Sequence, residues 1–145
     1  MVQLGDMNPW ERMVIDYNLL QLSPDSHPIQ LLRPLLHEGI VSSRHLEAMP
    51  DGSIVEMAGM VVTRQRPATA SGFIFLLLED EFGLVNVVVK PDVYEAARAQ
   101  IRMEPFLSVR GELQRKENTV NLIAERIVSL LIREKPLAPD ARSWG

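Results

Sequence analysis

Residues 73–90, FIFLLLEDEFGLVNVVVK, consist of two apolar runs that a short polar segment separates. The first run, 73–79, is apolar at almost every position, and the second, 84–90, is rich in valine, which favours strands. The segment 80–83 between them has the composition of a turn. We therefore expect two strands joined by a turn. Because the first strand is apolar on both faces, one face should line a core and the other should contact a helix or a ligand.

Three more strands and a helix are predicted around this stretch. Gly59, in the middle of the first strand, indicates a bulge or a sharp bend. Pro91 suits the start of a helix, which we expect to end near Arg102. The predicted strands, in chain order, span 53–66, 73–79, 84–90, 105–114 and 119–130.

This order of three strands, a helix and two strands is that of the OB-fold, a five-stranded Greek-key barrel with a helix between its third and fourth strands. Five short twisted strands leave two exposed edges unless the sheet closes. We therefore expect a mainly β fold with a closed barrel.

The residues before Gly52 have a helical rather than a strand-like pattern. Asn8 followed by Pro9 predicts the start of one helix, and a second short helix is expected near Pro28, with a kink at Pro34. We therefore predict three parts, namely a helical N-terminal segment (1–50), an OB-fold barrel that binds nucleic acid (51–132) and a flexible C-terminal tail (133–145).

The composition is that of an ordinary globular protein, with 46% hydrophobic and 23% charged residues among 145. The absence of cysteine excludes disulfides and thiolate chemistry, so we expect a cytoplasmic protein. No apolar run reaches the roughly 18 residues of a transmembrane helix, so we expect no membrane span. The net charge of −4 argues against strong binding of nucleic acid by bulk charge alone. Residues 59–130, however, contain nine basic and nine acidic side chains, so arginines could still line one face of the barrel.

Ligands of OB-folds lie across the second and third strands, between the loop that joins strands one and two and the loop that joins strands four and five. Aromatic side chains there stack on bases, and basic side chains contact phosphates. The residues that supply these groups at the expected places are Arg64, Arg66, Phe73, Phe75, Asn86, Lys90, Arg115 and Lys116.

All of these residues except Phe73 also have a structural interpretation. Phe75 shares its strand face with the polar Glu79, which favours an outward position, but a place in the barrel core is the alternative. Arg64 and Arg66 are two residues apart, hence on one face, and could be solvated surface arginines instead. An exposed polar strand face would explain Asn86 and Lys90, and a basic hairpin turn would explain Arg115 and Lys116.

The acidic run Glu79-Asp80-Glu81 is the one candidate for a metal site. Two-metal chemistry needs converging carboxylates, whereas adjacent residues of a strand point to opposite faces. We interpret the run as a solvated cluster that caps the turn. The three histidines are dispersed without metal-ligand spacing, and we expect no cofactor, no metal and no catalytic residue.

Residues 59–75, GMVVTRQRPATASGFIF, and 78–89, LEDEFGLVNVVV, resemble the C-terminal OB domain of bacterial DNA polymerase III α-type subunits, error-prone branch. The Arg-Gln-Arg-Pro-x-Thr-Ala-x-Gly pattern at 64–72 is specific to that branch, and the resemblance extends over residues 8–130. It implies binding of the single-stranded template DNA near the polymerase, without transfer of the catalytic domains. It also implies polymerase accessory subunits or the sliding clamp as partners.

A second, weaker similarity links Phe75, Leu78, Asp80 and Gly83 to the anticodon-binding OB barrels of class II aminoacyl-tRNA synthetases. This similarity implies that Phe75 stacks on a base with Arg64 nearby, whereas Asn86 replaces the usual glutamine. The sequence thus favours a non-catalytic module for single-stranded nucleic acid in translesion DNA synthesis. The alternative is a protein-interaction module that docks replication or mutagenesis accessory subunits. A third hypothesis, an enzyme, has the least support.

Overall fold

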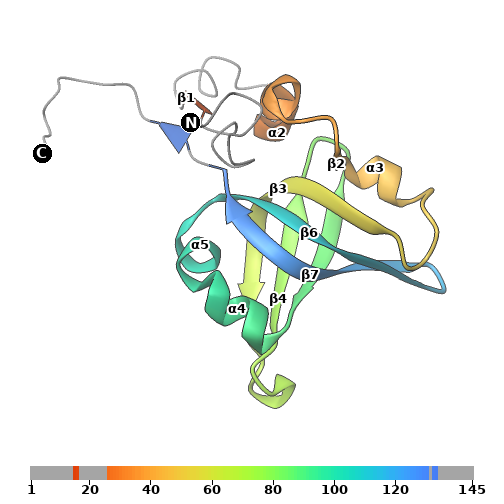
Figure 1. The fold of residues 1–145 in the computed structure, drawn as a ribbon, viewed down its shortest axis with the longest axis vertical. Coiled ribbons are helices and arrows are strands. Elements are labelled where there is room, and N and C mark those ends of the chain that lie inside the picture. The colour runs from red at the N-terminus through yellow and green to blue at the C-terminus, as the bar shows by residue number, and fades with distance from the viewer. Residues whose placement is uncertain (1–14, 17–25, 131, 134–145) are drawn as a thin grey trace, which may run out of the picture.

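The protein folds into a closed β-barrel with short helices at its two ends (Figure 1). The computed structural model describes residues 15–16, 26–130 and 132–133. The barrel strands are β3 (Ile54–Gln65), β4 (Ile74–Glu79), β5 (Leu84–Val89), β6 (Phe106–Lys116) and β7 (Thr119–Ser129). They pair in the order β3-β4-β5-β7-β6, and β3 also pairs with β6, which closes the sheet. The predicted OB-fold and its five strands are confirmed.

Two short helices, α4 (Pro91–Ala96) and α5 (Arg98–Met103), replace the single predicted helix. The chain breaks at Ala97, whose φ of −124° and ψ of 25° lie outside the helical range. Tyr94, Ala97 and Ile101 are buried with the side chains that fill the barrel. The two helices therefore cover one end of the barrel, which Figure 1 shows beside β4 and β7.

The segment before the barrel consists of α2 (Pro28–Leu32), a 3₁₀ turn η3 (Arg33–Leu35), the strand β2 (Ile40–Val41) and α3 (Ser43–Leu46). The change from α to 3₁₀ helix occurs next to Pro34, where a kink is predicted. Ile29, Leu32 and Leu36 form a second apolar cluster with Ala58 of β3 and with Phe106 of β6. The segment therefore packs on the outside of the barrel over β3 and β6.

Most of the helix predicted from Asn8 lies outside the described residues. Its two described residues, Ile15–Asp16, form a short strand β1 that pairs in parallel with β8 (Ile132–Arg133), so the prediction of helix is wrong there. Of the tail predicted at 133–145, Arg133 belongs to β8 and the rest lies outside the described residues. The division of the chain at residues 50 and 132 stays a prediction.

The bulge predicted at Gly59 occurs three residues later. The register between β3 and β4 shifts between Val61 and Thr63, so that Val62 is the extra residue. At Gly59, a Cβ atom would lie 2.9 Å from the Cβ of Leu78, so this glycine allows close approach of β4 instead. A one-residue insertion reverses the faces of all later residues of the strand.

Gly111 lies at a close approach of β6 and β7. The register between these strands shifts next to it, and a Cβ atom there would overlap the backbone carbonyl of Ile123. Because the overlap involves the main chain of the neighbouring strand, a rotamer change cannot relieve it. Of the helices in the described part, none is long and apolar enough to cross a membrane.

We expect Gly111→Ala to lower the free energy of unfolding by about 3 kcal/mol, because the strands must separate to admit the methyl group. The measurement is chemical denaturation of both proteins. Gly83→Ala is the control, because a Cβ atom there would have its nearest neighbour at 3.6 Å, in ordinary contact with Ser43. Equal stability of the Gly111→Ala variant and the wild type would contradict the close approach.

Candidate nucleic-acid interface

The outer surface of β4 and β5 presents the side chains Phe75, Leu77, Asn86 and Val88, which we call the β4–β5 face. In the strand register Phe75 lies opposite Val88, and Leu77 lies opposite Asn86. The alternate residues, such as Leu76 and Val87, are buried in the barrel. Phe75, Leu77 and Val88 are half-buried, and Asn86 is exposed. The face is therefore a continuous apolar surface with a polar amide at one side.

Phe75 lies on the outer face, as the pattern of its strand predicts. The half-buried Phe73 directly precedes β4, and the exposed Lys90 directly follows β5. The neighbouring strands extend this surface, because Gln65 of β3 lies opposite Phe75 and Asn121 of β7 lies opposite Asn86.

Arg64 does not lie beside Phe75, contrary to the prediction. It pairs in register with Leu76, whose side chain points into the barrel, so Arg64 is on the inward side of β3. Its guanidinium donates to the carbonyl oxygens of Ile101 and Glu104, with Nε–O at 2.6 Å and Nη2–O at 2.9 Å. These carbonyls end α5, so Arg64 satisfies helix-terminal acceptors. Arg64 is on this side because the bulge at Val62 reverses the faces of the residues that follow it in β3.

Arg66, two residues further on, also lies towards the helices. Its guanidinium carbon is 5.1 Å from the ring centroid of Tyr94 in α4, a cation–π contact. The prediction that the two arginines share a face is consistent with these positions. The face that they share is directed towards α4 and α5 rather than towards Phe75.

Arg115 has a structural environment as well. Its Nη2 atom lies 2.8 Å, 2.6 Å and 2.9 Å from the carbonyl oxygens of Leu46, Glu47 and Met49, respectively, and its Nε atom lies 3.2 Å from the last. These three carbonyls belong to the end of α3 and the turn after it. Arg115 therefore fastens α3 to β6.

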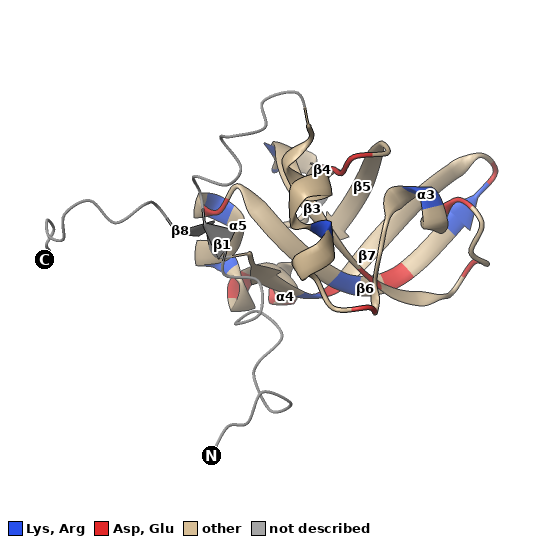
Figure 2. Cartoon of the chain, turned by 90° about the horizontal axis from the view of Figure 1, so that it is seen from above, with Lys and Arg blue, Asp and Glu red and all other residues tan. Residues whose placement is uncertain are grey.

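The two predicted lysines, unlike Arg64 and Arg115, do not bind backbone carbonyls of the described residues. Lys90 and Lys116 are exposed, and neither has a hydrogen-bond or ion-pair partner among the residues that the structure describes. Figure 2, which colours basic residues blue and acidic residues red, shows both signs distributed over the molecule. Of the five predicted cations, the two lysines are thus the ones without such a partner in the described part of the chain, whereas Arg64 and Arg66 are exposed but contact α5 and α4.

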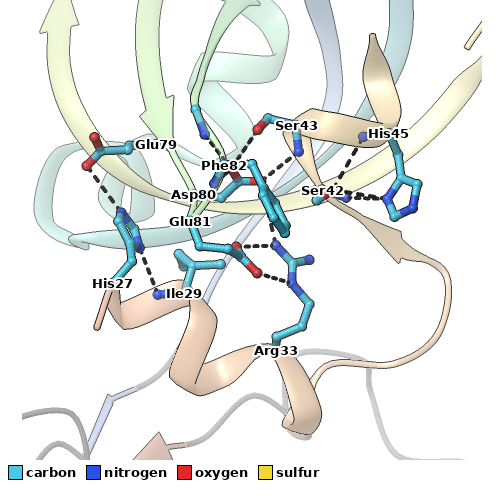
Figure 3. Close-up of polar contacts among 11 residues, drawn as sticks. His27, Ile29, Arg33, Ser42, Ser43, His45, Glu79, Asp80, Glu81 and Phe82 are labelled. Atoms are coloured by element: carbon cyan, nitrogen blue, oxygen red, sulfur yellow. Dashed lines mark hydrogen bonds and ion pairs between the residues drawn. The ribbon is translucent and has the colours of Figure 1, made fainter. Parts of the chain in front are cut away.

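The acidic run at the end of β4, Glu79 to Glu81, binds the N-terminal segment (Figure 3). Oε1 of Glu79 lies 3.2 Å from Nε2 of His27. The Glu81 carboxylate accepts two hydrogen bonds from Arg33, with Nε–Oε2 at 3.0 Å and Nη2–Oε1 at 2.7 Å. The interpretation of this run as solvated is therefore wrong. Within the described residues, no three side chains of metal-binding types lie close enough together to hold an ion.

Asp80 is 2% exposed and accepts four hydrogen bonds. Two come from the backbone N–H groups of Phe82 and Gly83 at 2.9 and 3.1 Å, which makes Asp80 the cap of the β4–β5 turn, as predicted. The other two come from Ser43 of α3, whose backbone N–H and hydroxyl donate at 2.6 Å each. The sequence gives no local signal for this contact, because the partners are 37 positions apart.

Comparison with known families identifies the barrel. The family model described as "OB-fold nucleic acid binding domain" matches residues 55–130, just over half of the chain. The chain belongs to this family.

This OB-fold domain also has curated relatives among bacterial polymerases. It is 39% identical to the error-prone DNA polymerase of Caulobacter vibrioides and 43% identical to that of Anaeromyxobacter dehalogenans. Each match covers 97% of this chain, but only 14% and 12% of the polymerases, in their C-terminal region. The resemblance to the error-prone branch is confirmed, and the OB-fold domain corresponds to a small part of the length of these relatives.

Solved structures support the fold. Asparaginyl-tRNA synthetase from Pyrococcus horikoshii, complexed with asparaginyl-adenylate, superposes with a TM-score of 0.56 at 21% identity, over 70% of this chain and 24% of that chain. An OBody bound to hen egg-white lysozyme gives 0.54 at 12% identity, over 67% and 98% of the two chains. At these identities, both similarities concern the architecture of the barrel.

We expect Arg115→Gln to lower the free energy of unfolding by about 2 kcal/mol, because three carbonyl groups at the end of α3 lose a charged donor. Thermal or chemical unfolding measures this loss. Lys116→Gln is the matched control, since it removes the adjacent exposed cation and should change stability by less than about 0.5 kcal/mol. Equal effects of the two substitutions would show that the Arg115 contacts do not hold α3.

Proposed function

We propose that this OB-fold domain binds single-stranded DNA across the β4–β5 face and that its own role is binding, not catalysis. The observation that supports this proposal most directly is the outward position of Phe75 and Leu77 beside the exposed Asn86. Unpaired bases have apolar faces and polar edges, and they bind to surfaces that offer stacking partners together with hydrogen-bonding groups at the side. Paired bases in a duplex do not present their faces in this way.

The packing of the N-terminal segment favours this side of the barrel. α2 and η3 cover the outside of β3 and β6 through the cluster of Ile29, Leu32 and Leu36. Within the described residues, no such apolar cluster covers Phe75 and Leu77. The β4–β5 face is therefore the side of the barrel at which an apolar ligand surface, such as a base, can replace water.

The charges favour binding of moderate strength. The net charge is −4, and the predicted arginines Arg64 and Arg115 donate to backbone carbonyls. Lys90, Lys116 and the exposed Arg66 remain to contact phosphates, and with so few cations stacking should supply most of the affinity. Binding should still weaken as salt increases, because each phosphate contact releases a counterion.

The relatives give this binding a context. In an error-prone DNA polymerase, a domain of this kind would hold the unpaired template strand near the polymerase domains during translesion synthesis. A binding role agrees with the acidic run, in which Glu79, Asp80 and Glu81 all have partners in the N-terminal segment. If the domain does not bind DNA at low salt but binds a polymerase accessory subunit, the protein-interaction alternative holds instead.

We expect Phe75→Ala to weaken binding of a fluorescein-labelled oligo(dT) by about ten-fold or more, because one base loses its stacking partner. Fluorescence anisotropy at low salt measures the dissociation constant. Phe82→Ala is the control, because Phe82 is a 51% exposed phenylalanine that lies by Arg33 and α2, away from the β4–β5 face. If Phe82→Ala weakens binding as much as Phe75→Ala does, the assigned face is incorrect.

We expect Lys90→Gln to reduce the slope of log K against log salt concentration by about 0.7, the value for one phosphate contact on single-stranded DNA. The measurement repeats the anisotropy titration at several salt concentrations. Arg98→Gln serves for comparison, because it removes an exposed cation of α5 that already lies 3.6 Å from Glu95. An unchanged slope for Lys90→Gln would remove Lys90 from the interface.

A further inference from the structure

A cleft adjoins the β4–β5 face at the side of Asn86. It has a volume of about 300 Å³ and lies between α3, the start of β5 and the turn of the β6–β7 hairpin. This volume is at the lower end of the range for small-molecule sites. Because Asn86 both lines the cleft and lies opposite Leu77, a strand that stacks on the β4–β5 face can place its next base in the cleft.

The walls of the cleft are held in place from two directions. Ser43, at the first position of α3, donates two hydrogen bonds to the buried Asp80, which closes the β4–β5 turn. At the other end of the helix, Arg115 binds the carbonyls of Leu46 and Glu47. α3 therefore cannot move away from β5 without breaking charge-assisted hydrogen bonds at both ends, so the cleft is formed before a ligand arrives.

The polar side chains around the cleft are two amides, one carboxylate and two hydroxyls, of which the Ser43 hydroxyl already donates to Asp80. The others come from Asn86, Asn118, Glu47 and Thr119, and the most exposed apolar side chain of the lining is Leu84, which is 55% exposed. The lining contains neither lysine nor arginine. A phosphate group would meet the Glu47 carboxylate without a compensating cation, so the chemistry of the cleft suits the edge of a base and not the backbone.

We propose that the cleft binds one unpaired base that has an exocyclic amino group, with cytosine preferred over thymine. The inference rests on the proposed function, because the base belongs to the strand held by the β4–β5 face. Glu47 can accept from the N4 amino group of cytosine, while the amides of Asn86 and Asn118 can donate to its N3 and O2 acceptors. Thymine presents O4 in place of the amino group, and this oxygen would face the carboxylate.

The test compares two pyrimidine oligonucleotides that differ in this edge, fluorescein-labelled oligo(dC) and oligo(dT) of equal length. At low salt we expect the wild-type domain to bind oligo(dC) about five-fold more tightly or better. Glu47→Ala should bring the ratio of the two dissociation constants close to one. Glu47 is exposed and makes no side-chain hydrogen bond to a described residue, so the variant should fold, which its thermal unfolding checks.

Glu47→Ala removes a negative charge, which raises the affinity for any oligonucleotide. Base selectivity is therefore judged from the ratio of the dissociation constants for oligo(dT) and oligo(dC). Glu38→Ala is the control, because it removes another exposed carboxylate, one between η3 and β2 outside the cleft. It should strengthen binding of both oligonucleotides equally and preserve the five-fold ratio. Phe75→Ala should weaken both without changing the ratio.

Two further outcomes separate the inference from the function on which it rests. If oligo(dC) and oligo(dT) bind the wild type equally, or if the preference survives Glu47→Ala, the cleft does not select the base, although the domain still binds single-stranded DNA. If neither oligonucleotide binds at low salt, the proposed function itself is wrong, and the inference about the cleft is wrong with it.

Discussion

The buried carboxylate of Asp80 determines how the barrel and the preceding segment fit together. Its four hydrogen bonds close the β4–β5 turn and fix the first residue of α3, with donor–acceptor distances between 2.6 and 3.1 Å. A buried charge is tolerated only when such donors surround it. The turn therefore sets the relative position of the β4–β5 face and α3, on which the shape of the proposed interface depends.

The basic residues divide between structure and surface. The fork of a guanidinium can serve several carbonyls at once, and Arg64 and Arg115 use it to bind the ends of α5 and α3, respectively. Lysine has a single compact charge, and Lys90 and Lys116 stay in solvent. An acidic protein with few accessible cations must rely on stacking, which depends little on sequence and is weakly selective by itself. Selectivity then has to come from polar groups beside the face.

Much of the fold could be predicted from the sequence, because strand order and the outward position of Phe75 follow from alternation and from Glu79. The position of Arg64 could not. The residues before it, Met60 to Val62, are all apolar, so no alternation shows where the bulge falls. The contact of Asp80 with Ser43 and the contacts of Arg115 with the end of α3 could not be predicted either, because the partners lie 37 to 69 positions away. Local patterns describe a strand well but do not reveal which distant carbonyl or hydroxyl a charged side chain will meet.

The attachment of α3 at both ends also makes the unfolding of this helix cooperative with that of the barrel. Because one anchor comes from the β4–β5 turn and the other from β6, the segment from His27 to Met49 cannot detach while the barrel stays intact without leaving Asp80 and Arg115 unpaired. Amide hydrogens of α3 should therefore exchange with solvent on the same timescale as those of the barrel strands. A shortened chain that starts at the first barrel strand would lose this shared protection, so the folding unit begins well before the barrel does.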